Sequence, residues 1–477
     1  MINKKITDDW ILLGFFYLIF GFVCLVLYPF ISENNWQIHG LICIIAATFS
    51  IFKLYNFRNN EFNYFIIDNR IVFLISFAVY FLFGASILSF GTDSDIYLAT
   101  LQYTVDASNA IKIDGLNFIG FGICLITTCI YNPSLFPSIV DKISIKLNEN
   151  TQIKAIFYLS LIGFISKFYV LSFDNQIYDN TDGQIISGLW RGLSNSLLMV
   201  IFLCAIYQGK KSSKFYIYAI SLTLFLVFLG LTSFNKTDAL TPIMALFGGL
   251  TFRYNSKKII LYGMILSFIL LSLIGGPVSY SRTNISSINT HSLIERISLF
   301  YSGLEAVSEG YDSANYSSWG RLSYTSAQAA SIDFYNSNDG GKDATLIPWL
   351  FIPRFLAPNK PVMTDTGTEF YTKMTGNFGS STSPGIFING YYNLGWIGLI
   401  FGSIICGLIL AEMAAISRVI ILNKNYLLYP IMFSSIYIAF RVDGTILSDY
   451  IGVFVIVVYS ILILLIFKKY ILKILKI

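Results

Sequence analysis

Five cationic side chains stand out in one long polar segment, residues 278–385, because each of them could bind a phosphate group. They are Arg282, Arg296, Arg321, Arg354 and Lys360. Arginine grips a phosphate through two parallel hydrogen bonds, and lysine adds a compact charge. Fixed cations in a low-dielectric site stabilise the negative charge that develops on a phosphate leaving group, and they need no metal to do so.

The same segment carries more acids than bases. Seven Lys and Arg stand against nine Asp and Glu between residues 278 and 385, so the segment is slightly negative. A surface that attracts anionic lipid headgroups needs a cluster of like charges, and we therefore interpret the cations as discrete sites. No group of acids and histidines with metal-ligand spacing is evident in the segment, and we expect neither a metal nor another cofactor.

Two of the cations lie in a stiff stretch, IPRFLAPNKP at residues 352–361. Three prolines in ten residues fix the backbone and exclude a regular helix. Arg354 and Lys360 would then be held in a defined geometry. The alternative interpretation is a plain rigid connection between two helices.

Four side chains of the segment could accept a proton from a substrate hydroxyl. They are His291, Glu295, Asp365 and Glu369. A general base must lie within hydrogen-bond reach of the proton that it removes. Glu369 is preferred because it lies between the proline-rich stretch and the next apolar run.

Residues 388–398, INGYYNLGWIG, bring amides, glycines and aromatic rings to the start of an apolar run. Glycines allow a backbone or a ligand to approach closely, and Asn389 and Asn393 need polar partners there. Tyr392 and its aromatic neighbours fit an aromatic belt at a membrane surface. They fit equally a platform on which a sugar ring stacks.

The first part of the polar segment predicts a helix. Ser292 and Glu295 have capping-box spacing, and apolar residues then recur every three or four positions as far as Leu304. Such a helix would lie along the membrane surface or pack on membrane spans. Arg296 would lie on the solvent-exposed face of this helix, unless it belongs to a binding site.

The composition indicates an integral membrane protein. Of 477 residues, 55% are hydrophobic and 12% are charged, and the mean hydropathy is +0.65, whereas soluble domains carry about 25% charged residues. The net charge of +5 is too small to imply nucleic-acid binding. All six cysteines lie in predicted spans, so we expect no disulfide in the polar segment. The first apolar run is read as an anchor and not as a cleaved signal.

Twelve stretches are long and apolar enough to cross about 30 Å of hydrocarbon. They lie near residues 11–31, 37–56, 71–91, 113–132, 152–173, 184–208, 215–233, 238–254, 259–277, 386–411, 426–440 and 450–467. We therefore expect residues 1–477 to form a single membrane domain. The polar segment 278–385 would be a large loop between the ninth and tenth spans.

Lys and Arg set the orientation of these spans, because they accumulate in cytoplasmic loops. With the N-terminus inside, basic residues alternate from loop to loop at every crossing. The outer loops then carry only Lys112, Lys236 and Arg441 besides the long loop, and they are rich in acids: Glu33, Asp93, Asp95, Asp106, Asp174, Asp179, Asp182, Asp443 and Asp449. Both termini are predicted to be cytoplasmic, and the long loop is predicted to be extracytoplasmic.

Three further cations approach the predicted outer face from the spans. Lys167 and Arg191 lie roughly 10 Å below the outer ends of the fifth and sixth spans, at 1.5 Å per residue, and Lys236 lies in a very short outer loop. Charges inside a membrane are costly and are usually paired or functional, although Lys167 could reach the interface. A cationic cavity open to the outer leaflet follows as a hypothesis.

The pattern as a whole resembles the Wzy-type oligosaccharide repeat-unit polymerases, which make bacterial O-antigen and capsule. IPRFLAPNKP resembles their proline-flanked arginine and lysine element, and PGIFINGYYNLGWIG, residues 384–398, resembles their entry into the next span. The topology resembles the family over nearly the whole chain, whereas the motifs cover only about residues 350–400. In that family an acid often stands where this chain has Asn389.

The resemblance implies an all-α polytopic fold of about twelve spans, related to the lipid-linked-sugar (GT-C-like) glycosyltransferases. The substrates would be undecaprenyl-pyrophosphate-linked oligosaccharides at the outer face of the bacterial inner (plasma) membrane, where the growing glycan passes onto a new lipid-linked unit. Partners would be membrane lipids, a chain-length regulator and a flippase, with no nucleic acid. Pyrophosphate and glycan would contact Arg191, Lys236, Arg282, Arg296, Arg321, Arg354, Lys360, Asn389, Tyr392 and Asn393, and the catalytic candidates are Glu369, Asp365 and His291.

Two other functions stay open. A ligase that transfers finished glycan to lipid A core shares the topology and the carrier, but the surroundings of His291 differ from the histidine-bearing motif expected of that family. A flippase for lipid-linked oligosaccharide would need charges through the depth of the bundle. Glu412, near the inner end of the tenth span, is the feature that favours transport.

Overall fold

The computed structural model consists of helices joined by turns and loops, and it has no strand in the residues that it describes. These residues are 4–57, 69–143, 149–173, 190, 193–254, 256–284, 293–309, 319–352, 356–357, 359–362, 365–377 and 381–475. The all-α class is thus confirmed for this part of the chain.

Eight helices of the described part are long and apolar enough to cross a membrane. They are Asp8–Phe30, Trp36–Tyr55, Asn69–Phe90, Ala107–Ile130, Glu149–Val170, Ser212–Thr232, Ile386–Leu422 and Ile446–Ile466. This finding confirms a multi-pass membrane protein. At the other predicted spans the structure has two shorter apolar helices, Ser196–Ile206 and Tyr429–Phe440, and the helices Lys236–Tyr254 and Lys257–Thr283. A total of twelve spans stays a prediction.

The chain divides into two compact units, each of which is described by itself. Unit 1 comprises Met1–Ile145 and Ser317–Lys468, and unit 2 comprises Lys146–Tyr316 and Lys469–Ile477. The predicted long loop is therefore shared, because its residues up to 316 belong to unit 2 and those from 317 belong to unit 1.

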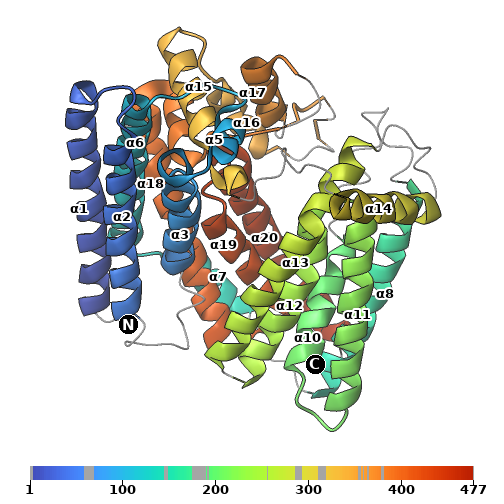
Figure 1. Cartoon of the computed structure of the whole chain (residues 1–477). Coiled ribbons are helices and arrows are strands. Elements are labelled where there is room, and N and C mark those ends of the chain that lie inside the picture. The colour runs from blue at the N-terminus through green and yellow to red at the C-terminus, as the bar shows by residue number, and fades with distance from the viewer. Residues whose placement is uncertain are drawn as a thin grey trace. The chain divides into compact units, whose positions relative to one another are not determined.

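Unit 1 contains the first and last thirds of the chain (Figure 1). Its early helices are α1 (Lys4–Leu27), α2 (Trp36–Phe57), α3 (Asn69–Phe77), the π-helix η3 (Ala78–Phe83), α4 (Ile87–Phe90), α5 (Asp93–Thr100), α6 (Ala107–Ile130) and α7 (Leu135–Ile143). Its late elements are η6 (Gly320–Leu322), α15 (Thr325–Asn336), η7 (Asp343–Leu346), α16 (Ile347–Leu350), α17 (Asp365–Thr375), α18 (Ile386–Leu422), α19 (Tyr429–Phe440), the π-helix η9 (Ile446–Gly452) and α20 (Val453–Leu475).

Helix α6 is the centre of unit 1, and α1 and α18 pack against it. It begins where the Asp106 carboxylate accepts a 2.7 Å hydrogen bond from the Asn109 amide, which satisfies a free backbone donor at the helix start. Small residues then let α1 approach closely, since a Cβ on Gly21 would lie 2.7 Å from the carbonyl oxygen of Gly115. Such small-residue contacts are how membrane helices associate without a hydrophobic driving force.

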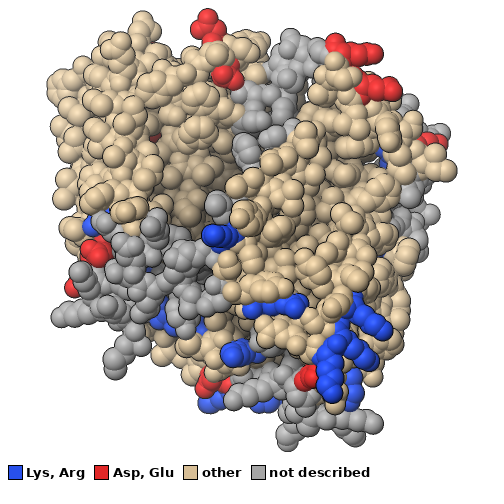
Figure 2. Space-filling view, turned by 60° about the horizontal axis from the view of Figure 1, so that its bottom comes forward, with Lys and Arg blue, Asp and Glu red and all other residues tan. Residues whose placement is uncertain are grey.

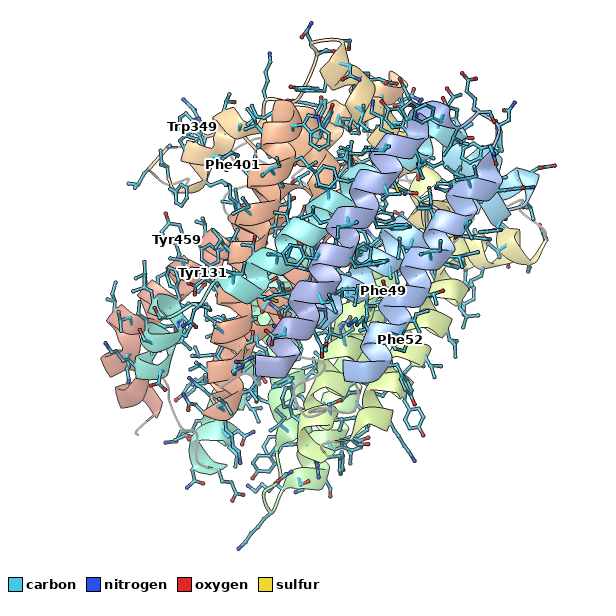
Figure 3. The ribbon with its side chains drawn as sticks, turned by 90° about the vertical axis from the view of Figure 1, so that its left-hand side faces the viewer. Phe49, Phe52, Tyr131, Trp349, Phe401 and Tyr459 are labelled. Carbon is cyan, nitrogen blue, oxygen red and sulfur yellow. The ribbon has the colours of Figure 1, made fainter. Side chains whose placement is uncertain are left out.

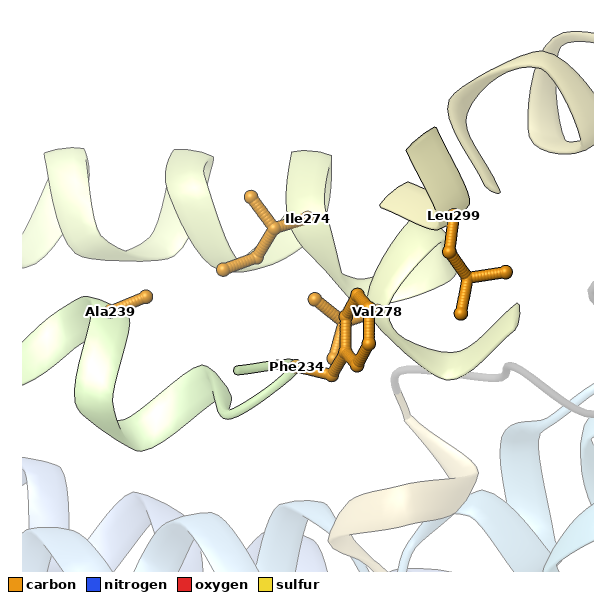
Figure 4. Packing of buried hydrophobic residues seen from close by; sticks show 5 residues of the cluster. All are labelled: Phe234, Ala239, Ile274, Val278 and Leu299. Carbon is orange, nitrogen blue, oxygen red and sulfur yellow. The ribbon is translucent and has the colours of Figure 1, made fainter. Parts of the chain in front are cut away.

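Unit 2 is a helical bundle with one helix lying across its end (Figure 1). The bundle consists of α8 (Glu149–Phe173), α10 (Ser196–Ile206), α11 (Ser212–Thr232), α12 (Lys236–Tyr254) and α13 (Lys257–Thr283), and α14 (Leu293–Ser308) crosses it. A buried cluster joins α12, α13 and α14 (Figure 4); its members are Phe234, Ala239, Ile274, Val278 and Leu299.

The predicted surface helix is α14. Of the four residues whose spacing predicts its apolar face, Ile294, Tyr301 and Leu304 are exposed and Ile297 is half-buried. Leu299 packs on α13 instead, and a Cβ on Gly303 would lie 2.8 Å from the carbonyl oxygen of Pro277. The helix therefore has a packing face, and a second apolar face that suits a membrane surface.

The outer faces of the helices are apolar, as contact with lipid requires. Phe52 of α2 and Phe401 of α18 are among many large exposed hydrophobic side chains, and both are labelled in Figure 3. Basic residues are concentrated at helix ends. Lys210, Lys211 and Lys214 are exposed at the turn between α10 and α11, and Figure 2 shows Lys and Arg gathered in the lower part of the view, with a few Asp and Glu beside them.

Helix α18 is broken near its start into two arms. Leu394 and Gly395 depart from helical geometry, and Gly395 has φ +62°, a conformation that side chains with a Cβ rarely adopt. The short arm, 386–393, folds back on the long arm. The two backbones are so close that a Cβ on Gly390 would lie 2.5 Å from the carbonyl oxygen of Gly398. The long arm, 396–422, extends about 40 Å, which is enough to cross a membrane.

Candidate functional site

The late elements of unit 1 meet at the broken end of α18, and Asn389 of the short arm joins two of them. Its Nδ2 donates a 3.1 Å hydrogen bond to Asp343 Oδ2 at the start of η7. Its Oδ1 accepts a 3.2 Å hydrogen bond from the Ile446 amide at the start of η9. One buried amide therefore fixes two segments that are far apart in the sequence.

Asn393, one turn later, completes this arrangement. Its Oδ1 accepts a 2.7 Å hydrogen bond from the Asp343 backbone amide, and its Nδ2 lies 3.3 Å from the Asp343 carboxylate. We call Asn389, Asn393 and Asp343 the Asn389 joint. The polar partners and the close backbone approach expected for residues 388–398 are both present. The two asparagines position the site, and their amides are occupied by protein groups.

A cluster of charged groups lies immediately beyond the joint, between α19 and η9. Arg441 Nε donates a 3.0 Å hydrogen bond to Asp449 Oδ1, and Arg441 Nη1 lies 3.6 Å from Asp443 Oδ2. The hydroxyl of Tyr324, just before α15, donates a 3.0 Å hydrogen bond to Asp443 Oδ2. We call Tyr324, Arg441, Asp443 and Asp449 the Arg441 cluster.

The local sequence explains why Asp449 faces Arg441. Thr445 caps η9, since its hydroxyl accepts from the Ser448 amide at 3.2 Å. Asp449 Oδ2 then accepts from the Thr445 amide at 2.9 Å, so that a negative group satisfies a free donor at the start of the helix. The absence of a side chain at Gly444 provides the space for the Asp449 carboxylate, because a Cβ at residue 444 would collide with it. A π-helix at this position is notable, since π turns often mark functional sites.

The charges of the Arg441 cluster do not cancel. Two carboxylates face one guanidinium, and the two acids are buried. Burial raises the pKa of Asp443, although Arg441 and the Tyr324 hydrogen bond work in the opposite direction. Burial also raises the pKa of the Tyr324 hydroxyl, and the Asp443 charge adds to this effect. Tyr324 therefore stays a donor, and Asp443 is prepared to take up a proton.

One atom of this cluster is not satisfied. Asp443 is only 8% exposed, and its Oδ1 has no hydrogen-bond partner among the residues that the structure describes. Leaving a buried carboxylate oxygen unpaired is costly, and such atoms need an explanation. Oδ2 is held by Tyr324, so Oδ1 is the atom of Asp443 whose lone pairs no described protein group uses.

A further ion pair lies beside Tyr392 of the short arm. Lys373 of α17 is 2.7 Å from Asp339 Oδ2, and its ammonium lies 4.5 Å from the ring centre of Phe334. Helix α17 is held there by Phe370, which packs against Tyr392 with ring centres 5.3 Å apart. Tyr392 thus belongs to a packed cluster with Ala327 and Ala330 of α15.

The remaining predicted residues of unit 1 are spread along its late segments. Glu369 is exposed on α17, and Asp365 is the first residue of that helix, with its side chain outside the described set. Lys360 donates a 3.0 Å hydrogen bond to the carbonyl oxygen of Ile352, so its side chain binds the residue at which the proline-rich stretch begins. Arg321 lies in η6, where only its backbone is described, and Arg354 lies outside the described residues.

Five predicted residues belong to unit 2. Lys236 begins α12, and its ammonium is 3.5 Å from the Ser279 hydroxyl on α13. Arg282 lies in the last turn of α13, with only its backbone described, and Arg296 lies half-buried on α14. The packing of α12, α13 and α14 brings these three to one end of the unit. Arg191 and His291 lie outside the described residues.

Sequence reasoning counted Arg441, Asp443 and Asp449 only as charges of a short outer loop. A usable signal was present, because one cation and two acids occur within nine residues directly after an apolar helix. Tyr324 gave no such signal, since 119 residues separate it from Asp443.

The Arg441 cluster brings together a buried acid with a raised pKa, Asp443, a guanidinium held by two carboxylates, Arg441, and a hydroxyl donor, Tyr324. These groups can remove a proton from a hydroxyl and stabilise a nearby negative charge. No family model, curated protein or solved structure matches this chain.

Proposed function

We propose that this protein is a membrane glycosyltransferase that polymerises oligosaccharide units carried on undecaprenyl pyrophosphate, outside the cytoplasm, with Asp443 as the general base. The observation that carries the role of Asp443 is the unpaired Oδ1 of a buried carboxylate in the Arg441 cluster. The carrier and the glycan rest on the resemblance of residues 352–361 and 384–398 to the Wzy-type polymerases.

In the proposed reaction a hydroxyl of the incoming lipid-linked unit attacks the anomeric carbon of the growing glycan. The new bond joins the acceptor oxygen to that carbon, and the bond between that carbon and the pyrophosphate oxygen breaks. The pyrophosphate leaves on its lipid with the electron pair, and the acceptor proton passes to Asp443 Oδ1. No oxidant, reductant or sugar nucleotide enters the balance.

The raised pKa of Asp443 suits this role, because a base is most effective when its pKa approaches the working pH. Arg441 and Tyr324 act on it as positioning residues. Arg441, anchored by Asp449, favours the ionised form of Asp443, and Tyr324 holds Oδ2 so that Oδ1 faces the substrate. Glu369, the base preferred from the sequence, is exposed on α17.

The leaving pyrophosphate needs cations, and the candidates stay those named from the sequence. Arg321, Arg354 and Lys360 belong to unit 1, and Arg191, Lys236, Arg282 and Arg296 belong to unit 2. In this proposal Asp443 serves the acceptor, and cations from this set serve the donor. The cytoplasmic termini and the extracytoplasmic long loop are part of the same proposal.

Transport of the lipid-linked substrate is the second candidate function, and one observation favours it. Glu412 of α18 is buried in a candidate span, where Tyr131 donates a 2.6 Å hydrogen bond to its Oε1. An acid inside a membrane is often part of a substrate or proton pathway. A ligase has no comparable observation in its favour.

Deletion of the gene, followed by analysis of surface glycan on a gel, tests these functions against one another. Loss of a polymerase leaves single-repeat glycan with no ladder. Loss of a flippase traps repeat units at the cytoplasmic face, and loss of a ligase leaves long polymer on its carrier. A full ladder in the deletion strain would contradict the proposal.

A further inference from the structure

Three ionisable side chains that the proposed reaction does not use meet between α2 and α6 in unit 1. His39 and Cys43 lie four residues apart on α2, so they share one face of the helix. Asp114 of α6 faces them. All three are almost completely buried, with exposures of 0%, 2% and 2%. We call them the His39 cluster.

The distances within the His39 cluster match those between ligands of one tetrahedral metal ion. His39 Nε2 lies 3.3 Å from Asp114 Oδ2, and Cys43 Sγ lies 3.8 Å from His39 Nε2 and 3.9 Å from Asp114 Oδ2. Zinc bonds of 2.0–2.3 Å at tetrahedral angles put nitrogen and oxygen about 3.4 Å apart, and sulfur about 3.6 Å from either. Movements of a few tenths of an ångström would bring the three ligand atoms to the separations expected around one ion.

A hydrogen-bond chain determines which nitrogen of His39 faces the other two groups. The Ser89 hydroxyl of α4 donates to the Trp36 carbonyl oxygen at 2.9 Å, which uses its only proton. It must therefore accept from His39 Nδ1, 2.7 Å away. A neutral His39 then carries its proton on Nδ1 and presents the Nε2 lone pair to Asp114 and Cys43. Metal-binding histidines are commonly oriented in this way.

A lone pair that faces a carboxylate across 3.3 Å is repulsive unless a positive charge lies between them. A divalent ion removes this conflict. With a thiolate at Cys43 and a carboxylate at Asp114, its charge balances both ligands, so a neutral group is buried among the spans. The thiolate and imidazole select zinc-like ions and disfavour Mg²⁺ and Ca²⁺, which prefer oxygen.

We propose that His39, Cys43 and Asp114 bind one zinc-class divalent cation that ties α2 to α6. The site lies on other helices of unit 1 than the Arg441 cluster, and its three protein ligands leave the fourth tetrahedral position to a small ligand such as water. The rival occupant is a proton that lies between His39 Nε2 and Asp114 Oδ2.

The test uses the full-length protein purified in detergent, incubated with Zn²⁺ or Co²⁺, and freed of loose metal on a chelating column. One metal ion per chain is expected by mass spectrometry of the elements. Co²⁺ should give the absorption of a tetrahedral site and a thiolate-to-cobalt charge-transfer band. A wild-type protein that retains no metal, or a Co²⁺ spectrum without the thiolate band, would overturn the proposal.

Substitutions localise the metal. C43S and H39Q should lose the bound ion, whereas C124S, which removes another buried cysteine from α6, should keep one ion per chain. S89A keeps all three ligands and should weaken binding about 10- to 100-fold, because it removes the orienting hydrogen bond. Retention of one ion by C43S, or loss of the ion from C124S alone, would count against the site. If C43S does not fold, S89A and the cobalt spectrum of the wild type still decide.

Discussion

The Arg441 cluster and the His39 cluster are both buried groups of ionisable side chains in unit 1, but they balance their charge in different ways. In the Arg441 cluster, Arg441 contacts both acids directly, at 3.0 and 3.6 Å. In the His39 cluster, Asp114 faces a thiol and the unprotonated nitrogen of a neutral histidine. Because a buried acid needs a positive partner, the first cluster has a cation within the chain for its two acids, whereas the second needs a cation or a proton from outside its three side chains.

The largest expected effect comes from removing the proposed base. Asp443→Asn keeps the shape of the side chain and its contact with Tyr324, but its amide accepts a proton poorly. Loss of a general base typically lowers a rate by about 10²–10⁴-fold. We expect this loss in the rate of polymer formation from lipid-linked repeat units in membranes, with protein levels unchanged.

Asp93→Asn is the matched control, since it makes the same change at an exposed position on α5. It should polymerise at the wild-type rate. Burial raises the pKa of Asp443, so the base form is lost at a higher pH than an ordinary aspartate would give. The acid limb of the wild-type pH–rate profile should therefore lie above the usual aspartate value of 3.8. Wild-type activity in Asp443→Asn would remove it from the mechanism.

Removal of the guanidinium should make the Arg441 cluster resemble the His39 cluster, with acids that lack a cation. Arg441→Met leaves Asp443 and Asp449 uncompensated. Breaking a buried pair on one side typically costs about 3–5 kcal/mol, and the partial exposure of Arg441 reduces this to roughly 2–3 kcal/mol. Thermal unfolding in detergent would measure the loss.

The double variant Arg441→Met with Asp449→Asn distinguishes charge from packing. It should be more stable than Arg441→Met alone, because one uncompensated acid is gone. Equal or additive losses in the double variant would mean that Arg441 contributes packing and no charge balance.

Removal of zinc tests how the His39 cluster balances its charge. A ligand that binds only the folded protein stabilises it by about 2.7 kcal/mol at a hundred times its dissociation constant. Adding Zn²⁺ to metal-free wild-type protein should therefore raise its melting temperature, and a chelator should reverse the change. C43S should show neither shift, and C124S should show both. A shift of the same size in C43S would place the effect elsewhere.

Much of the fold could be predicted, because its determinants are local in the sequence. Apolar length predicted twelve spans, eight of which coincide with the candidate membrane-spanning helices, and helical periodicity predicted α14. The glycines and asparagines of residues 388–398 correctly indicated close backbone contact and buried polar partners. The division of the long loop between two units was not predictable, since it depends on which helices each part packs against.

The clusters were harder to predict because they depend on contacts between distant segments. Tyr324 and Asp443 are separated by 119 residues, and Cys43 and Asp114 by 71. In a single sequence, His39 and Cys43 are two ordinary residues of an apolar stretch. The expectation of no metal rested on the residues of the polar loop, whereas His39, Cys43 and Asp114 lie in the spans.

The smallest expected effect comes from adding an acid where the chain has an amide. Asn389→Asp would place a second carboxylate beside Asp343 in the Asn389 joint, 3.1 Å away, in place of a hydrogen-bond donor. Like charges raise the pKa of such a pair, so the folded protein binds a proton more tightly than the unfolded chain does. Stability should therefore fall as the pH rises, by roughly 1–2 kcal/mol between pH about 5 and 8 relative to wild type.

Asn389→Ala is the control for this substitution. It also loses the hydrogen bond to Asp343 and the one from Ile446, but it adds no charge, so its loss of stability should not depend on pH in this range. If Asn389→Asp is equally destabilised at both ends of the range, then Arg441 or another cation already compensates the joint. In that case the Asn389 joint would resemble the Arg441 cluster, in which a cation faces buried acids, and the contrast with the His39 cluster would become sharper.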